Sequence, residues 1–143
     1  MIMLEDRNPL EKLHSPAAKP VIRILLVDDE LVVRNSLKLQ FQLEPGVYIV
    51  GEARNGREAI QMTAELNPDL VIMDLLMPDL DGLLATARLA ASYPQLKIII
   101  LSVQDDLQTQ ALAIAAGATD FVAKRDVETL LEAVRRLIYQ NRV

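Results

Sequence analysis

Short apolar runs alternate with longer amphipathic segments along the chain from residue 21 onward. The runs have the length of strands, are rich in Val and Ile, and end at polar residues or turn signals, which is typical of buried β-strands. Between them apolar residues return every three or four positions, as at Val33, Leu37 and Phe41, which predicts helices that bury one face. The predicted strands cover residues 21–27, 48–53, 70–73, 97–101 and 120–123, and a helix is expected after each one.

This alternation predicts an α/β fold with a parallel sheet, because parallel neighbours need a crossover helix between them. The strands are apolar almost throughout rather than at every second position, which indicates burial on both faces. We expect a single doubly wound (βα)5, flavodoxin-like domain at residues 21–143, with a five-stranded sheet in the order 2-1-3-4-5. Residues 1–20 contain Pro9, Pro16 and Pro20 and lack periodicity, so we expect an N-terminal tail or linker there.

The composition excludes several kinds of chemistry. The chain of 143 residues has no cysteine and one histidine, His14, which rules out a disulfide, a zinc–thiolate site and a multi-histidine metal site. Lys and Arg number 15 against 20 Asp and Glu, a net charge of −5, and this balance argues against direct binding to nucleic acid. No apolar stretch approaches the roughly 18 residues of a membrane span. We therefore expect a soluble, cytoplasmic protein.

Polar residues follow the predicted strands at the edge where an open α/β sheet binds its ligands. The first strand is followed by Asp28 and Asp29, the third by Asp74, the fourth by Ser102 and the fifth by Lys124. In the expected strand order the first and third strands are neighbours, so the three aspartates should meet in one shallow pocket. A hydroxyl group and an ammonium group should lie beside them.

Such a cluster needs a bound cation, because two carboxylates about 5 Å apart repel each other by roughly 3 kcal/mol at an effective dielectric constant near 20. Oxygen ligands from few residues suit Mg²⁺, which keeps several waters. With its neighbours neutralised, one carboxylate can attack an electrophilic phosphorus atom and form an acyl phosphate. Ser102 and Lys124 would then provide a hydrogen bond and a positive charge to the phosphoryl oxygens.

Each of these residues also has a purely structural interpretation. Asp29 and Glu30 stand where a helix begins, and acids there cap free amides and interact favourably with the helix dipole. A serine or lysine at a strand end is usually structural or solvated, and we expect His14, in the tail, to be solvated. Asp74 is harder to explain in this way because it ends a strongly apolar strand. Polar residues at four strand ends together favour a functional site.

Four motifs, in order and at these spacings, resemble the receiver domain of two-component response regulators, the CheY-like phosphoacceptor family. They are Leu-Leu-Val-Asp28-Asp29-Glu30, Val-Ile-Met-Asp74-Leu-Leu-Met77-Pro78-Asp-Leu-Asp-Gly82, Ile-Ile-Leu-Ser102 and Gly117-Ala-Thr-Asp-Phe121-Val-Ala-Lys124. The resemblance covers about residues 21–140. Many receivers have proline after the lysine, whereas Arg125 follows here, which is similar to receivers fused to LuxR-type helix-turn-helix domains.

The resemblance implies a role for each residue of the pocket. Asp74 would accept the phosphoryl group. Asp29 would bind Mg²⁺ directly, Asp28 would hold the ion largely through water, and the backbone carbonyl of Leu76 would be a further ligand. Lys124 would pair with the phosphoryl group.

The resemblance also assigns residues that respond to the phosphoryl group. Ser102 would close onto it, and the rotamer of Phe121 would change with phosphorylation. The alternative for Phe121 is an ordinary core ring. Met77, Pro78 and Gly82 would shape the loop after the phosphoacceptor.

The implied function is a phosphorylation-dependent switch rather than an enzyme with turnover. A sensor histidine kinase would transfer a phosphoryl group to Asp74 and add about two negative charges. The fourth and fifth predicted helices and the strand at 120–123 would form the surface that reads out this change.

The fourth predicted helix has a face of small side chains. Such a face suits a mobile helix, a homodimer or output contact, or simply close packing on the sheet. Its alanines are Ala111, Ala113, Ala115 and Ala116. We expect the chain to be the regulatory part of a transcription factor that has a DNA-binding output domain. The alternative is a stand-alone or degenerate receiver that acts as a protein-interaction module.

Residues of the pocket also disfavour other interpretations. A flavodoxin-like cofactor binder would need a phosphate loop rich in Ser, Thr and Gly where Asp28 and Asp29 stand. A phosphatase of the haloacid dehalogenase type would need a second acid two positions after Asp74, where this chain has Leu76. Since Leu76 cannot orient an attacking water, we predict slow self-dephosphorylation unless Gln104 compensates.

Overall fold

The structure is a computed structural model that describes residues 21–77, 79 and 81–140. Its strands and helices alternate in the order β1 (Ile22–Val27), α2 (Leu31–Gln42), β2 (Val47–Ala53), α3 (Gly56–Leu66), β3 (Leu70–Met73), α4 (Gly82–Ser92), β4 (Lys97–Ser102), α5 (Leu107–Ala116), β5 (Asp120–Ala123) and α6 (Val127–Gln140). The expected tail at residues 1–20, with His14, and the expected loop residue Pro78 lie outside the described residues. None of the helices described is long and apolar enough to cross a bilayer.

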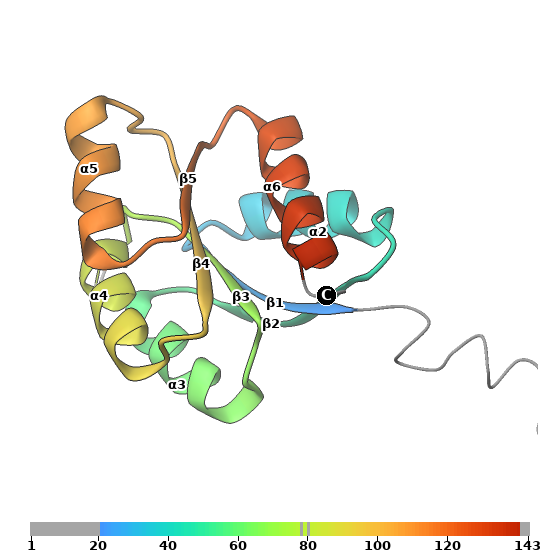
Figure 1. Cartoon of the computed structure of the whole chain (residues 1–143), viewed down its shortest axis with the longest axis horizontal. Coiled ribbons are helices and arrows are strands. Elements are labelled where there is room, and N and C mark those ends of the chain that lie inside the picture. Colours follow the sequence, from blue (N-terminus) through green and yellow to red (C-terminus); the bar gives the residue numbers. More distant parts are fainter. Residues whose placement is uncertain (1–20, 78, 80, 141–143) are drawn as a thin grey trace, which may run out of the picture.

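The five strands form one parallel sheet in the order β2-β1-β3-β4-β5. Because β1 lies between β2 and β3, the winding of the chain reverses beside β1, which is where such sheets bind their ligands. Figure 1 shows α2 and α6 on one side of the sheet and α3, α4 and α5 on the other. The predicted fold class and strand order are confirmed.

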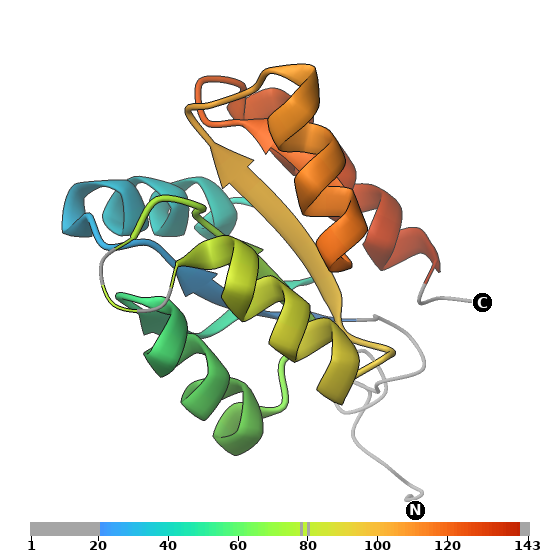
Figure 2. The ribbon, with the colours of Figure 1, turned by 90° about the vertical axis from the view of Figure 1, so that its left-hand side faces the viewer.

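Two apolar cores, one on each face of the sheet, hold these layers together. Alternate residues of β1 enter opposite cores: Ile24 and Leu26 pack with α2 and α6, whereas Leu25 and Val27 pack with α3, α4 and α5. Figure 2 shows α3, α4 and α5 side by side across their face of the sheet. Since β1 and β3 are buried on both faces, the ends of these strands are fixed relative to each other.

Local signals in the sequence begin and end several helices. The side chains of Asn55, Asp81 and Asp106 cap α3, α4 and α5, each by accepting a hydrogen bond from a backbone N–H three residues further on. Helix α5 ends at Gly117, whose φ of 115° lies in the left-handed region that glycine adopts without strain. This agrees with the predicted helix end at Gly117.

Helix α2 begins where the sequence predicts but lacks the expected capping hydrogen bond. Glu30 is its N-cap residue, but the Glu30 side chain makes no capping hydrogen bond. The carboxylate of Asp28 instead accepts the backbone N–H of Glu30, at 2.9 Å. The interpretation of Glu30 as a capping acid is therefore wrong, because its side chain accepts no backbone N–H of the helix. The interaction of Asp29 and Glu30 with the helix dipole stays a prediction.

Candidate functional site

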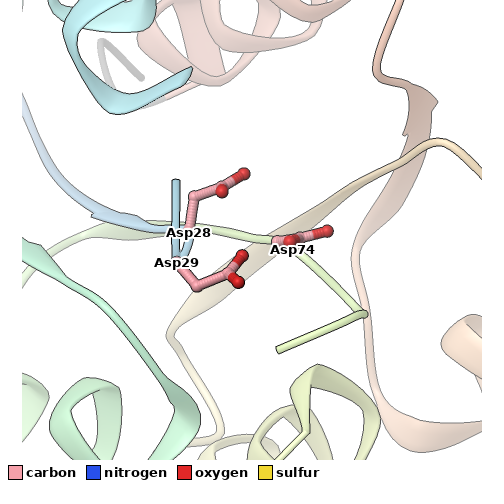
Figure 3. Close-up of side chains that lie close together, drawn as sticks. All are labelled: Asp28, Asp29 and Asp74. Atoms are coloured by element: carbon pink, nitrogen blue, oxygen red, sulfur yellow. The ribbon is translucent and has the colours of Figure 1, made fainter. Parts of the chain in front are cut away.

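The register of the two central strands assembles an acid pocket. Val27 of β1 pairs with Met73 of β3, so Asp28 and Asp74 follow at neighbouring positions on the carboxyl edge of the sheet. The backbone N–H of Asp74 donates to the carbonyl of Val27, at 2.9 Å, which continues the ladder to the pocket. One oxygen from each of Asp28, Asp29 and Asp74 lies within 4.8 Å of the other two. Figure 3 shows the three side chains leaving adjacent strand ends and projecting to the same side.

The three acids differ in their access to solvent. Asp28 and Asp74 are 3% and 4% exposed, whereas Asp29 is an exposed residue. The pocket therefore has a buried floor and one carboxylate at the mouth, from which a cation or a phosphoryl donor can approach.

Lys124, directly after β5, brings a positive charge to the floor of the pocket. Its Nζ lies 2.8 Å from Oδ2 of Asp28, 3.5 Å from Oδ2 of Asp74 and 3.7 Å from Oε1 of Glu30. Burial works to lower the pKa of Lys124, but the hydrogen bond to Asp28 and the nearby carboxylates outweigh burial and raise it. Lys124 is thus a permanent cation in this pocket.

The environment of Asp74 makes its carboxyl group unusually basic. Burial, followed by repulsion from Asp28, raises the pKa of Asp74 from 3.8 to about 6, while Lys124 and the backbone N–H of Leu76 act in the opposite direction. Asp74 is therefore mainly ionised at neutral pH. The acids around Lys124, which include Glu30 as well as the three aspartates, outnumber this one ammonium group, so the pocket has an excess of negative charge.

The donor set of the pocket fits Mg²⁺. All three side chains offer carboxylate oxygens, the hard ligands that this ion prefers, and the excess of negative charge favours a cation. Opposite ligands of an octahedral Mg²⁺ are about 4.2 Å apart. The 4.8 Å limit on the oxygen separations is slightly wider than this, so one ion at the centre would hold the three acids partly through its own waters.

The loop after Asp74 turns its residues alternately inward and outward. Leu75 and Met77 are buried, whereas the side chain of Leu76 is 54% exposed. Gly82 closes the loop, and a Cβ atom at this position would lie 2.0 Å from the backbone carbonyl oxygen of Asp74. Any other residue would push the loop away from Asp74, which explains the expected role of Gly82 in shaping this loop.

Ser102 and Phe121 lie on the two strands beyond β3. Ser102 is fully buried at the end of β4, and its Oγ accepts the backbone N–H of Gln104 at 3.1 Å. Because a hydroxyl group also carries a proton, Ser102 keeps a donor for a further acceptor. Phe121 pairs with Ile100 across the sheet and is half-buried against the core that faces α3, α4 and α5. Its ring is partly a core residue, and its change of rotamer stays a prediction.

Two charged residues beside the pocket were not predicted from the sequence. Arg34 of α2 is buried and bonds both to the backbone of Asp28 and to Glu52 of β2. The only signal was its position in the helical pattern, directly after Val33 and three residues before Leu37, which places it at the border of the apolar face.

Residues 24–135 match the model of the response regulator receiver domain. The chain belongs to this family and is thus a receiver domain of two-component response regulators, whose members are phosphoacceptors. The expected resemblance is confirmed.

Curated relatives of this chain include an enzyme and a transcriptional regulatory protein, and both are longer than this chain. The chain is 37% identical to a protein-glutamate methylesterase/protein-glutamine glutaminase of Alkalilimnicola ehrlichii, over 84% of this chain and 32% of that protein. It is 32% identical to the transcriptional regulatory protein DegU of Brevibacillus brevis, over 80% of this chain and 49% of that protein. The chain therefore spans only about a third to a half of the length of these relatives.

Solved structures agree with the fold. A LuxR-family two-component response regulator from Aurantimonas has a TM-score of 0.79 at 30% identity, over 84% of this chain and 86% of that chain. The response regulator domain of Thermotoga maritima CheB has a TM-score of 0.76 at 30% identity, over 83% of this chain and 97% of that chain.

Proposed function

We propose that this chain is a phosphorylation switch in which Asp74 accepts a phosphoryl group from a sensor histidine kinase, in a reaction that requires Mg²⁺. The observation that carries the proposal is the convergence of three carboxylate oxygens within 4.8 Å of one another, next to the ammonium group of Lys124. Asp74 is the natural acceptor because its carboxylate lies 3.5 Å from the ammonium group of Lys124, is close to the other two acids and is ionised at neutral pH.

The transfer follows from the roles of the pocket residues. A carboxylate oxygen of Asp74 forms a bond to phosphorus while the bond from phosphorus to the donor's histidine nitrogen breaks; the electron pair stays on the imidazole, which takes up a proton. Asp28, Asp29 and the carbonyl of Leu76 would hold Mg²⁺, which neutralises charge on the phosphoryl oxygens when it is bound. Lys124 would supply a second positive charge to the same oxygens.

The switch would begin at Ser102. The phosphorylated Asp74 carries about two negative charges and new acceptor oxygens, and the free proton of the Ser102 hydroxyl can donate to them. Since the Ser102 Oγ also holds the N–H of Gln104, movement of this serine would pull the loop between β4 and α5. Asp105 of that loop forms an ion pair with Arg125 at 2.5 Å, which joins the loop to the end of β5.

We propose the surface of α5, β5 and α6 as the one that reads out this movement and as the contact for a homodimer. Helix α5 supports this role because it buries little more than Ala113 among its own residues, while Leu107, Leu112 and Ile114 are exposed. Apolar side chains on an outward helix face favour a protein contact over solvent. Ala113 is buried in the core between α5 and the sheet, which supports the close-packing interpretation for the inner face of this helix. The dimer or output contact is proposed for its outer face.

We propose that the chain, as a receiver domain at residues 21–143, regulates a DNA-binding output domain of a cytoplasmic transcription factor. Similarity to LuxR-family regulators and to DegU supports this output. The methylesterase relatives support a second one, an enzyme domain controlled by the same switch. The receiver itself would act once per phosphorylation, without turnover. The intact acid pocket disfavours a degenerate receiver that serves only as an interaction module.

Intact-mass analysis after incubation with acetyl phosphate tests the proposal. The wild type should gain one phosphoryl group in the presence of Mg²⁺ and none in the presence of EDTA, and Asp74→Asn should gain none under either condition. A phosphoryl adduct on Asp74→Asn would contradict the site. A folded wild type that gains no adduct would favour the interaction module instead.

A further inference from the structure

Arg34 connects the acid pocket to the edge of the sheet. It is 8% exposed and lies in the first half of α2. Its Nη1 donates to the backbone carbonyl of Asp28 at 2.7 Å, and its Nε donates to Oε1 of Glu52 at 3.0 Å. Oε2 of Glu52 accepts from Nζ of Lys38 at 2.8 Å. Glu52 is thereby held from two sides and in turn holds the guanidinium group in place.

The bond from Arg34 controls the direction in which the chain leaves β1. The carbonyl of Asp28 and the amide nitrogen of Asp29 share one rigid peptide plane. When Arg34 fixes this carbonyl, it also fixes the plane from which Asp29 starts. The side chain of Asp28 is anchored separately, by the N–H of Glu30 and the ammonium group of Lys124. Asp29 is exposed, so its position depends mainly on its backbone.

We propose that Arg34 is a positioning residue for the Mg²⁺ site, an inference that rests on the function proposed above. Arg34 would act through the Asp28–Asp29 peptide without touching the ion. Its positive charge alone works against cation binding at the neighbouring acids, so any gain in affinity has to come from geometry. The ion pair with Glu52, whose side chain is 29% exposed, also contributes little net stability, which favours a role in placing Asp28 and Asp29.

A lysine cannot replace Arg34 in this role. The guanidinium group is a planar fork whose Nε and Nη1 point to two separate acceptors at once, whereas an ammonium group is a compact point charge on a flexible stem. Arg34→Lys therefore keeps the charge and removes the geometry. Lys38→Met is the matched control, because it removes the other ion pair of Glu52 and leaves the bond to Asp28 intact.

The test is calorimetric titration of each folded variant with Mg²⁺, together with urea unfolding in EDTA. Loss of a residue that orients metal ligands weakens metal affinity by about 10- to 100-fold, so we expect Arg34→Lys to weaken Mg²⁺ binding by about 10-fold. Lys38→Met should leave the affinity within about twofold of the wild type, since it removes no contact of Asp28. Equal losses of affinity in the two variants, or wild-type affinity in Arg34→Lys, would overturn the proposal.

A measurement on the wild type does not depend on the folding of a variant. The Nε–H signal of Arg34 in a ¹H–¹⁵N spectrum should shift on addition of Mg²⁺ with the dissociation constant found by calorimetry, and absence of a shift would also overturn the proposal. Asp29→Asn separates this inference from the function. If Asp29→Asn binds Mg²⁺ as tightly as the wild type, the metal site itself is wrong. If Asp29→Asn binds Mg²⁺ more weakly while Arg34→Lys keeps the wild-type affinity, only the positioning role is wrong.

Discussion

Replacing Asp74 with asparagine should stabilise the metal-free fold at neutral pH and leave it unchanged in acid. Burial and repulsion from Asp28 raise the pKa of Asp74 from 3.8 to about 6. Between these two values the folded protein keeps a proton that the unfolded chain has released. The free energy of unfolding therefore falls as the pH rises from about 4 to about 6.

The size of this effect follows from the pKa values. The difference of 6 − 3.8, about 2 pKa units, corresponds to about 3 kcal/mol at 1.36 kcal/mol per unit. Asparagine has nearly the shape of a protonated aspartate and carries no charge at any pH. Asp74→Asn should thus exceed the wild type in stability by up to about 3 kcal/mol above pH 7 and match it near pH 4.

Urea unfolding of both proteins in EDTA, followed by circular dichroism between pH 4 and pH 8, measures this difference. Asp81→Asn is the control, because Asp81 is exposed and asparagine caps α4 as well as aspartate does. The control should follow the wild-type curve. A stability difference between Asp74→Asn and the wild type that stays constant from pH 4 to pH 8 would refute the reasoning.

Three further substitutions test separate parts of the site. Lys124→Met removes the cation that lowers the pKa of Asp74, so a carboxyl NMR titration should place this pKa above 6. Phosphorylation by acetyl phosphate should slow by about 100-fold. An unchanged pKa of Asp74 would contradict the pairing. Leu76→Asn places a polar group at an exposed position beside Asp74. It should shorten the phosphoryl lifetime about 10-fold in a gel assay of phosphoprotein. An unchanged lifetime would show that this position does not control the attacking water. Gly82→Ala forces a Cβ atom against the Asp74 carbonyl. This substitution should lower the free energy of unfolding by at least about 2 kcal/mol. A loss below about 0.5 kcal/mol would show that the loop adapts to the added Cβ atom.

The fold could be predicted because its signals are local or periodic. The apolar runs of β1 and β3 are buried on both faces, as continuous runs predict. Gly117 ends α5 because its φ is positive. The meeting of Asp28 and Asp74 followed from strand order and from the rule that parallel strands end on the same edge.

The rest depends on contacts between distant residues, which sequence patterns do not encode. Arg34 on α2 and Glu52 on β2 lie 18 positions apart and meet because α2 packs against β2, which pairs with β1. Whether Glu30 caps α2 also could not be read from the sequence: its side chain makes no capping hydrogen bond, and its own backbone N–H donates to the carboxylate of Asp28. The pKa of Asp74 likewise depends on its burial, which exists only in the folded protein.

The central claim is that Asp28, Asp29 and Asp74 share one divalent cation. Anomalous diffraction from crystals soaked in Mn²⁺, which takes the same oxygen ligands as Mg²⁺, tests it directly. We predict a single anomalous peak within bonding distance of carboxylate oxygens of Asp29 and Asp74 and of the backbone carbonyl oxygen of Leu76. A peak bound elsewhere on the protein, or no peak among the three acids at saturating Mn²⁺, would contradict the claim.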